Sequence, residues 1–437
     1  MNDENMILFL CTMQVASLAL YTVWKTKKSK CWRNRRWWVR PINTRRAQYG
    51  DFATLFAELK KDEDMFFRYM RMDVPTFYEL LRLVGPFLQK RSIRTPICPE
   101  QRLAITLRYL ATGDQMLSVA LAYRVGESTA HMIVKETCSV IADVLMPIYV
   151  KHPTKEEWMK ISSDFLELWN LPNCVGAIDG KHISIQAPPN SGSTYFNYKK
   201  TFSIVLMAAC DARYKFTLFN VGAYGSESDS GILSRSDFGK SLYSDTLNIP
   251  GGTTLLPGSD KKVFYYFVGD EAFQMSTHMM RPYPGRSLNE QKRIFNYRLS
   301  RARRIIENTF GIFTARWRIF LRSICASPDV ADRLVLAAIC LHNFLKTKND
   351  EKVPLQQRYC HPQFTDRETE EGDLIEGEWR QQTQIDQIRP MRNAGAHRAT
   401  REAYTMRDTL SSYFMTAAGE VPWQYEYIRR GQHHDVP

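Results

Sequence analysis

The stretches that decide the fold are Cys174-Val-Gly-Ala-Ile-Asp-Gly180 and Val263-Phe-Tyr-Tyr-Phe-Val-Gly-Asp270. Each is a short apolar run that ends in an aspartate next to a glycine. Residues 202–209 and 216–221 form two more apolar runs of similar length. Short runs of this kind, bounded by Gly, Asp or Pro, are typical of strands in a sheet that is covered on both faces. We therefore expect four central strands, two of which carry an aspartate at their C-terminal ends.

The order of the segments along the chain indicates the topology. Three closely spaced strands come first, a helix follows near residues 230–242, then the strand that ends at Asp270, and then a long helix. Three strands linked by hairpins and followed by a crossover are the layout of a ribonuclease H-like core. We therefore predict an α/β fold class for residues 169–347, with a mixed sheet flanked by helices.

The long helix is expected at about 290–320, because apolar residues recur there at every third or fourth position. These residues are Phe295, Leu299, Ala302, Ile306, Phe310, Phe313, Trp317 and Phe320. Glu307 lies beside this apolar stripe, and Gly311, one turn further on, would leave the surface next to Glu307 uncovered. Glu307 could then reach the ends of the strands. The alternative is that Glu307 only forms an ion pair with Arg303 or Arg304 on the helix surface.

Together, Asp179, Asp270 and Glu307 indicate a metal site. Hard divalent cations such as Mg²⁺ or Mn²⁺ take oxygen ligands, and two ions a few ångströms apart need carboxylates that come from separate elements. Three converging carboxylates would repel one another without a cation. A single aspartate at a strand end is more often a cap or turn residue. The complete set, in this order of strands and helix, favours a site for a divalent metal cation, with two ions expected.

A helical region is predicted for residues 51–168, where strand signals are scarce. Within it, residues 117–144 have a helix-turn-helix pattern, with a turn at Gly126 and a second helix that Ser128 could cap. The exposed start of that second helix would face base edges or phosphates in a major groove of DNA. Its exposed residues are Thr129, His131 and Lys135. Plain packing of a helical hairpin is the equal alternative.

The composition indicates a globular protein with an anionic partner. The chain has 437 residues, 44% of them hydrophobic, which excludes disorder throughout and is enough for one large or two ordinary domains. Lys and Arg number 59 against 46 acidic residues, and the net charge of +13 favours DNA or RNA over acidic small molecules. The 9 cysteines are scattered without a C-x-x-C pair, which favours a reducing compartment and argues against a zinc finger.

Residues 1–50 are predicted to form a segment of their own. Residues 6–24 carry no charge, and residues 25–46 hold ten Lys or Arg and no acid. We expect the apolar part to be a buried or loosely packed helix; a membrane anchor is the less favoured alternative, because polar residues dilute it. The basic part interleaves tryptophans with arginines, which suits phosphate binding and import into the nucleus. A solvated arm is the equal alternative. The expected location is the nucleus, with the cytoplasm second.

Residues 348–437 are predicted to be an acidic linker followed by one short helix. Residues 365–378 are strongly acidic, and the polar sequence up to Arg401 has no hydrophobic period. Beyond it, apolar residues recur at helical spacing, so we expect a short amphipathic helix near the end of the chain. These apolar residues are Met406, Leu410, Tyr413 and Phe414.

Several stretches make the sequence similar to the PIF/Harbinger transposase-derived nucleases, which are DDE superfamily endonucleases. The stretches are Gly176-Ala-Ile-Asp-Gly-Lys-His182, Ala187-Pro-Pro-Asn-Ser-Gly192, Tyr195-Phe-Asn-Tyr198, Val221-Gly-Ala-Tyr-Gly-Ser226, Phe267-Val-Gly-Asp-Glu-Ala-Phe273, Arg281-Pro-Tyr-Pro-Gly285 and Asn296-Tyr-Arg-Leu-Ser-Arg-Ala-Arg-Arg304. The resemblance extends over roughly residues 52–345. It implies that Asp179, Asp270 and Glu307 are the DDE catalytic triad. Asp229 matches a further family acid, an additional metal ligand that also competes with Asp270 for the role of second triad acid.

The resemblance implies a metal-dependent DNA endonuclease that hydrolyses phosphodiester bonds with two metal ions, and a separate Myb-like partner protein that delivers it to DNA. Basic residues near the acids would neutralise the DNA backbone. These are Lys181, His182, Lys199, Lys200, Arg303 and Arg304. The alternative for His182 is a hydrogen bond within the sheet, and the alternative for Lys199 and Lys200 is plain solvation.

The rival function is that of a domesticated, catalytically inactive DNA-binding or regulatory protein that keeps the fold. Retention of every acid weighs against this rival. An oligomer is compatible with the sequence, and association with a membrane is not expected.

Overall fold

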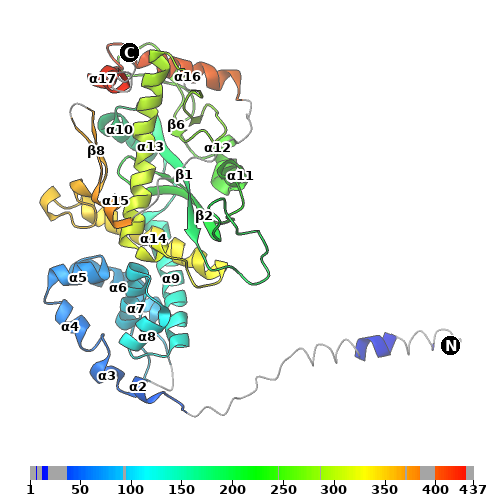
Figure 1. The fold of residues 1–437 in the computed structure, drawn as a ribbon, viewed down its shortest axis with the longest axis vertical. Helices are drawn as coiled ribbons and strands as arrows, with labels where there is room; N and C mark the ends of the chain where they lie inside the picture. The colour runs from blue at the N-terminus through cyan, green and yellow to red at the C-terminus, as the bar shows by residue number, and fades with distance from the viewer. Residues whose placement is uncertain are drawn as a thin grey trace, which may run out of the picture.

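The computed structural model describes residues 6, 12–17, 37–91, 95–244, 246–285, 287–369, 372–383 and 399–429. The predictions for the apolar segment and for the first part of the basic segment fall mostly outside these residues. No helix in the described part of the chain is both long enough and apolar enough to cross a membrane. Figure 1 shows the N-terminal helices at one end of the molecule, the C-terminal helices at the other end, and the sheet between them.

The first part of the described chain is helical, as the pattern predicted. Polar side chains begin several of these helices: Asp73 accepts the N–H of Thr76 at 2.9 Å, and Thr154 forms a capping box with Glu157. The helices are α2 (Pro41–Thr44), α3 (Arg46–Tyr49), α4 (Leu55–Leu59), α5 (Glu63–Met70), α6 (Val74–Leu88), α7 (Pro99–Thr112), α8 (Met116–Ala122), α9 (Glu127–Tyr149) and α10 (Lys155–Trp169).

Helices α8 and α9 are joined by a turn, but α9 begins earlier and ends later than expected. Gly126 is the cap residue of α9, and Ser128 lies inside its first turn. The expectation of a cap at Ser128 is therefore wrong. Tyr149, at the end of α9, packs edge-on against Phe344 of α14 (Pro328–Asp350), with ring centroids 5.2 Å apart. This contact with a distant part of the chain extends α9 beyond its predicted end.

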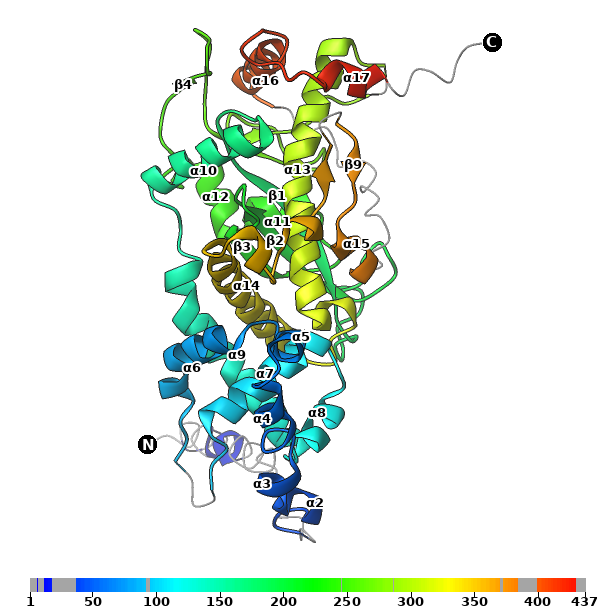
Figure 2. The same ribbon diagram turned by 90° about the vertical axis from the view of Figure 1, so that its left-hand side faces the viewer.

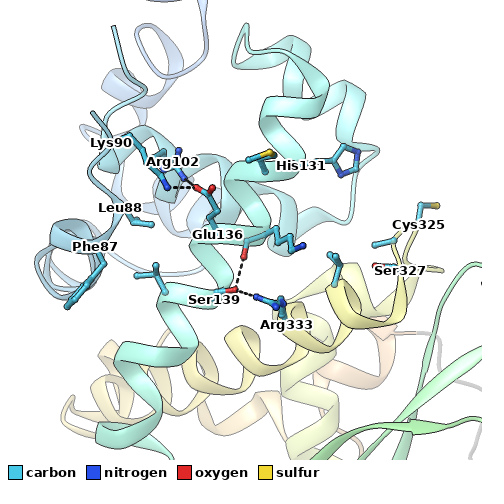
Figure 3. Close-up of a pocket in the computed structure, with 15 residues that line it drawn as sticks. Phe87, Leu88, Lys90, Arg102, His131, Glu136, Ser139, Cys325, Ser327 and Arg333 are labelled. Atoms are coloured by element: carbon cyan, nitrogen blue, oxygen red, sulfur yellow. Dashed lines mark hydrogen bonds and ion pairs between the residues drawn. The ribbon is translucent and has the colours of Figure 1, made fainter. Parts of the chain in front are cut away.

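The first half of α9 and the start of α14 border a hollow of about 700 Å³ (Figure 3). Arg333 of α14 donates to the hydroxyl of Ser139 at 2.8 Å. On the other side, the carboxylate of Glu136 accepts from Arg102 and lies 3.1 Å from the ammonium of Lys90. The exposed side of α9 therefore faces a hollow with basic walls.

The central sheet has the order β3-β2-β1-β6-β7. The first three strands are antiparallel neighbours, and β1, β6 and β7 are parallel. Strands β1 to β3 match three of the predicted runs, and β7 has no counterpart in the prediction. The strands are β1 (Cys174–Ser184), β2 (Ser203–Cys210), β3 (Phe216–Tyr224), β6 (Tyr266–Val268) and β7 (Met279–Met280). The fourth predicted run is divided, because its first residue belongs to a separate hairpin of β4 (Thr254–Leu255) and β5 (Lys262–Val263).

Strand β1 is longer than the apolar run that predicted it. It continues to Ser184, and Asp179 pairs with Ala208 of β2 in the middle of the strand. The expectation that Asp179 ends its strand is therefore wrong. The reason is that β2 provides backbone partners beyond the apolar run, and a polar side chain does not end a strand whose backbone remains paired.

Helices cover both faces of the sheet (Figures 1 and 2). On one face lie α14 and the long helix α13 (Glu290–Arg316), whose apolar residues share a core with Ala177 and Leu206. On the other face lie α10, α11 (Asp229–Arg235) and α12 (Asp237–Tyr243), which share a second core with Ile178. The mixed sheet flanked by helices is therefore confirmed.

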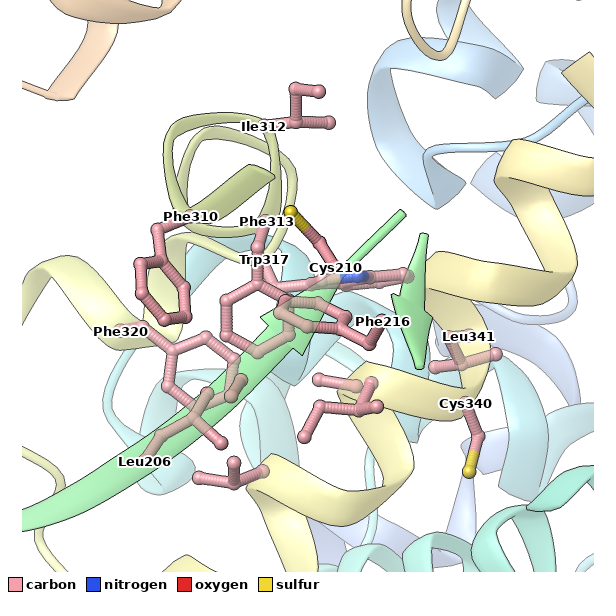
Figure 4. Packing of buried hydrophobic residues seen from close by; sticks show 14 of the residues in the cluster. Leu206, Cys210, Phe216, Phe310, Ile312, Phe313, Trp317, Phe320, Cys340 and Leu341 are labelled. Carbon is pink, nitrogen blue, oxygen red and sulfur yellow. The ribbon is translucent and has the colours of Figure 1, made fainter. Parts of the chain in front are cut away.

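The apolar stripe predicted for α13 packs against the sheet (Figure 4). The ring of Phe216, on β3, lies 6.0 Å from that of Phe310 and 5.6 Å from that of Phe313. Phe313 in turn stacks on Phe320 at 4.7 Å. Because Phe310 and Phe313 lie one to two turns after Glu307 on α13, their packing fixes the rotation of the helix there and hence the direction in which Glu307 points.

The acidic stretch after α14 is folded onto α13, where the sequence predicted a linker. Asp366 is 2% exposed, and its carboxylate accepts two hydrogen bonds from Arg380, at 2.9 and 2.6 Å. From Arg401 on, the described residues form two helices where one was expected. The elements after α14 are η2 (Pro354–Gln356), η3 (Pro362–Phe364), β8 (Arg367–Glu368), β9 (Leu374–Ile375), α15 (Glu378–Thr383), α16 (Arg401–Tyr413) and α17 (Gln424–Arg429).

The sequence suggested that Gly311 leaves an open surface beside Glu307. The structure shows that this surface is covered. The indole of Trp379, on α15, fills the space where a side chain at position 311 would stand. The same indole donates to Asn308 at 2.7 Å. Gly311 is therefore a packing site for a residue 68 positions further along the chain, which no local pattern could indicate.

Candidate active site

Strand pairing places Asp179 and Asp270 at the same level of the sheet. Ala177 of β1 lies opposite Val268 of the parallel strand β6, and each aspartate comes two residues after one of these partners. Residues two apart on a strand share a face. Asp179 therefore stands on the same face as Ala177, the face that α13 covers.

Asp229 approaches from the other side, as the first residue of α11. The hydroxyl of Ser228 caps this helix by accepting the N–H of Gly231 at 3.4 Å. The carboxylate of Asp229 occupies the space where a Cβ at position 180 would lie. Gly180 is thus required for this close approach, and the Asp-Gly pair at 179–180 was its signal in the sequence.

Glu307 extends from α13 and forms an ion pair of 2.9 Å with Arg303, one turn earlier on the same helix. This is the pair that the sequence gave as the alternative for Glu307. Glu307 is nevertheless close enough to raise the pKa of Asp179, and Arg303 lowers the pKa of both Asp179 and Asp270. The guanidinium of Arg303 is therefore a cation shared by the acids.

The four acids act on one another electrostatically. Burial raises the pKa of Asp179 to about 8, and the negative charges of the other three acids add to that rise. Burial and the charge of Asp270 raise the pKa of Asp229 to about 6. Burial also raises the pKa of Asp270, and the hydrogen bond from the N–H of Ala272 offsets part of this rise. The structure thus brings together all four predicted acids, which we call the acid cluster (Asp179, Asp229, Asp270 and Glu307).

The chemistry of this cluster suits a hard divalent cation. Asp179 accepts the N–H of Gly180 at 2.9 Å, and Asp270 accepts that of Ala272 at 2.9 Å. Carboxylate oxygens are the ligands that Mg²⁺ and Mn²⁺ prefer. The described residues contain no group of three His, Cys, Asp or Glu already spaced to hold one ion. Binding of a cation would therefore require these carboxylates to move toward one another.

Two of the predicted DNA-binding residues on β1 point into the protein. Lys181 is 9% exposed, its ammonium lies 5.6 Å from the ring centroid of Phe310, and burial lowers its pKa to about 8. A nitrogen of His182 lies 2.9 Å from the hydroxyl of Ser203, on β2. Burial lowers the pKa of His182 to about 4, so its ring is neutral at pH 7. These contacts correspond to the alternative role that the sequence offered for His182.

The other predicted basic residues are distributed differently. Lys199 and Lys200 are exposed on the connection between β1 and β2. Arg304 donates to Glu368 at 2.9 Å and is therefore bound to the C-terminal segment. Thr129, on α9, is also exposed, but it lines another hollow formed with residues 37–47.

His131 and Lys135 are likewise exposed on α9 and line the 700 Å³ hollow, in the helical end of the molecule. The structure does not bring them to the acid cluster. The sequence analysis also missed Gly180 and the role of Arg303 as a shared cation. The spacing of Arg303 and Glu307, four residues apart on a helix, was the available signal for their pair.

Comparison with known proteins agrees with this geometry. Residues 178–343 match the sequence model of a family described as DDE superfamily endonuclease, and they include all four acids. An Arabidopsis thaliana protein named Antagonist of like heterochromatin protein 1 is 28% identical over 68% of this chain and 80% of its own length. A second, named ALP1-like, is 27% identical over 60% and 65%. A human protein named "Putative nuclease HARBI1" is 22% identical over 61% and 73%.

No solved structure matches the chain. The class that the sheet, its helices and the acid cluster define is that of a DDE-type endonuclease domain. Residues 178–343 match such a domain, and the chain is similar to Harbinger transposase-derived nucleases.

Proposed function

We propose that this protein is a metal-dependent DNA endonuclease with a ribonuclease H-like catalytic core. The observation that carries the proposal is the acid cluster, whose aspartates have raised pKa values because they are buried together. Grouped carboxylates whose ionised form is disfavoured, chiefly by burial, are characteristic of sites that receive a cation. The sheet order, with three antiparallel strands and a parallel crossover to β6, supports the assignment of the core.

Asp179 and Asp270 would hold the metal from adjacent strands, with Asp229 and Glu307 completing the oxygen ligands from α11 and α13. When bound, a pair of divalent ions would supply activation of water and stabilisation of the leaving oxygen. Arg303 would leave Glu307 free to turn toward the metal by pairing with a DNA phosphate instead. His182, neutral at pH 7, would hold Ser203 in place through its hydrogen bond.

The proposal includes DNA as the substrate, the nucleus as the location and a separate Myb-like partner. The net charge of +13 supports a polyanionic substrate. The basic segment 25–46 supports import into the nucleus. The resemblance to the family supports the partner, which co-purification with the full chain would test.

Cleavage of supercoiled plasmid DNA in Mg²⁺ or Mn²⁺ tests the proposal. We expect the wild type to nick the plasmid and Asp179→Asn to lower the rate by about 1,000-fold or more, since it removes a charge from the centre of the cluster. Asp237→Asn is the matched control, because Asp237 is fully exposed on α12. Equal nicking by the wild type and Asp179→Asn would contradict the proposal.

A second candidate is a regulatory protein that binds DNA without cutting it. Two observations favour it: the ion pair that holds Glu307 on Arg303, and the similarity to a plant protein named as an antagonist rather than as a nuclease. In that case the wild type and Asp179→Asn would bind DNA equally, and neither would nick it in either metal. Calorimetric titration with Mn²⁺ would then show no binding that depends on Asp179.

A further inference from the structure

The connection between β1 and β2, residues 186–202, carries exposed aromatic side chains. Tyr198 is 47% exposed and Phe196 is 41% exposed, and Tyr224, at the end of the neighbouring β3, is 44% exposed. Lys199 and Lys200 follow Tyr198 directly and are exposed too. Aromatic rings interleaved with cations on a surface are the elements with which proteins bind single-stranded nucleic acid.

Internal hydrogen bonds hold this connection in shape. Asn197 is 4% exposed, and its carbonyl oxygen accepts the N–H groups of Lys199 and Thr201, at 3.0 and 3.1 Å. Its amide donates to the hydroxyl of Ser203 at 2.9 Å, and the same hydroxyl contacts His182. The backbone turns at Lys200, where φ is 61°. The exposure of Tyr198 is therefore a property of an ordered turn.

The turn places Tyr198 at the rim of the acid cluster. The ring of His182 lies edge-on to that of Tyr198, with centroids 5.5 Å apart. His182 lies two residues after Gly180 on β1, so it stands on the face that the carboxylate of Asp229 approaches. Burial, followed by the charges of Asp229 and Asp179, raises the pKa of Tyr198. One edge of the ring thus meets His182 beside the acids, and nearly half of the side chain is open to solvent.

Lys199 adds a cation to this ring. Its ammonium lies 5.8 Å from the ring centroid of Tyr198 and has no ion-pair partner among the described residues. A phosphate is the group that such an exposed ammonium would pair with in a DNA complex. Tyr198 therefore presents an exposed ring and a neighbouring cation on a turn that Asn197 fixes.

We propose that Tyr198 is a stacking platform for an unpaired nucleotide base next to the phosphodiester bond that is cut, with Lys199 bound to the phosphate of that nucleotide. The ligand is thus DNA with a locally unpaired strand, and not a fully paired duplex alone. Every base has a flat face, so this contact selects unpaired structure rather than sequence. The inference rests on the proposed nuclease function for the position of the cut, and on DNA binding alone for the stacking.

Binding of fluorescent DNA by the full chain tests the inference in Ca²⁺, without reliance on cleavage. We compare a fully paired 25-base-pair duplex with the same duplex carrying a three-nucleotide single-stranded gap. The wild type is expected to bind the gapped DNA about 5- to 100-fold more tightly. Tyr198→Ala should abolish this preference, and Tyr198→Phe, which keeps the ring, should retain it.

Tyr404→Ala is the matched control, because Tyr404 is 40% exposed on α16, at the far end of the molecule. Lys199→Gln should weaken binding of both DNAs. The slope of log affinity against log salt concentration should fall by about 1, which corresponds to the loss of one phosphate contact. Thermal unfolding verifies that each variant is folded. If Tyr198→Ala loses its fold, Tyr198→Leu provides the same test with an apolar side chain that cannot stack as a ring does.

The outcomes separate this inference from the proposed function. A preference for gapped DNA that disappears in Tyr198→Ala supports the platform, even if plasmid nicking fails. The absence of any preference in the wild type overturns it. An unchanged preference in Tyr198→Ala also overturns it, even if plasmid nicking succeeds.

Discussion

Buried arginines on α13 and buried aspartates in the acid cluster are both ionisable groups away from water, but the protein treats them in opposite ways. Arg298 is 2% exposed and donates to the carbonyl of Gly419 at 3.1 Å and to Gln424 at 3.0 Å. It also donates to the carbonyl of Asn170, and its guanidinium lies 4.5 Å from the ring centroid of Phe414. This arginine joins three distant parts of the chain.

Asp179, by contrast, is 7% exposed and accepts the N–H of its own neighbour, Gly180. The cation that lowers its pKa is Arg303, which is engaged with Glu307. A buried charge with several partners stabilises the fold, whereas a buried charge with few partners lowers stability unless something else binds it. The comparison separates the residues that build the molecule from those that are available for a ligand.

The largest effect should follow from breaking the arginine side of the comparison. Arg298→Ala leaves the carbonyls of Gly419 and Asn170 buried without a donor, so we expect the free energy of unfolding to fall by about 3–5 kcal/mol. Urea denaturation would measure it. Lys292→Ala is the control on the same helix, because Lys292 is exposed, and its effect should stay within about 0.5 kcal/mol. Similar losses for both variants would refute the assignment.

Replacing a buried aspartate of the acid cluster should raise stability, whereas replacing Arg298 lowers it. The pKa of Asp179 is about 8 in the folded protein and near 3.8 when unfolded, so without metal the native state binds the extra proton between these values. Stability in a chelator should therefore fall as the pH rises from about 4 to about 8. Asp179→Asn should remove much of this loss and be more stable than the wild type at pH 8 by about 1–3 kcal/mol.

Thermal unfolding at pH 5 and pH 8 in EDTA measures this difference. At pH 5 the two proteins should be similar, because the native state then holds Asp179 in its protonated, neutral form, which resembles the asparagine of the variant. Asp237→Asn, which changes an exposed carboxylate, should show no such dependence. A destabilised Asp179→Asn at pH 8 would argue that the carboxylate has a structural partner.

A smaller effect should follow from changing the approach of Asp229. Gly180→Ala puts a methyl group where that carboxylate lies, so Asp229 must turn away while the strand remains paired. We expect about a tenfold weaker affinity for Mn²⁺ and a change in stability of under about 1 kcal/mol. Calorimetry measures the affinity for Mn²⁺, and denaturation of the same sample measures the stability. A large loss of stability with unchanged affinity would mean that Asp229 is not a ligand.

The smallest effect should come from Arg303, the cation shared by the acids. Arg303→Gln releases Glu307 and removes a positive charge that lowers the pKa of Asp179 and Asp270. The affinity for Mn²⁺ should rise about 3-fold, because the ion no longer competes with a guanidinium. DNA affinity should fall at the same time, since Arg303 would no longer contact a phosphate. Weaker binding of Mn²⁺ would show that Arg303 supports the site instead.

Local patterns predicted much of the core, and three of the four acids were chosen from local patterns, with Asp229 added by the family resemblance. Short apolar runs gave strands β1 to β3, and the three-or-four spacing gave α13. These signals are readable because burial on a strand or a helix repeats with a fixed period along a continuous stretch. The family-like motifs gave the four acids, which the structure brings into electrostatic contact.

The remaining features depend on partners far away in the chain. The position of Asp179 within β1 depends on pairing with β2, and the role of Gly311 depends on Trp379. The acidic stretch around Asp366 resembled a linker because its partner, Arg380, neutralises it only after folding. Composition reports how polar a segment is, but not whether its charges find partners.

The sequence by itself therefore determined the strand and helix segments, the net positive charge and the identity of the acids, because each is written in a local run of residues. Only the tertiary structure decided that Lys181 is buried, that Arg303 is bound to Glu307, and that Tyr198 stands exposed beside the acids. Burial and pairing are properties of the neighbours that surround a side chain, and those neighbours come from segments that meet only in the folded protein.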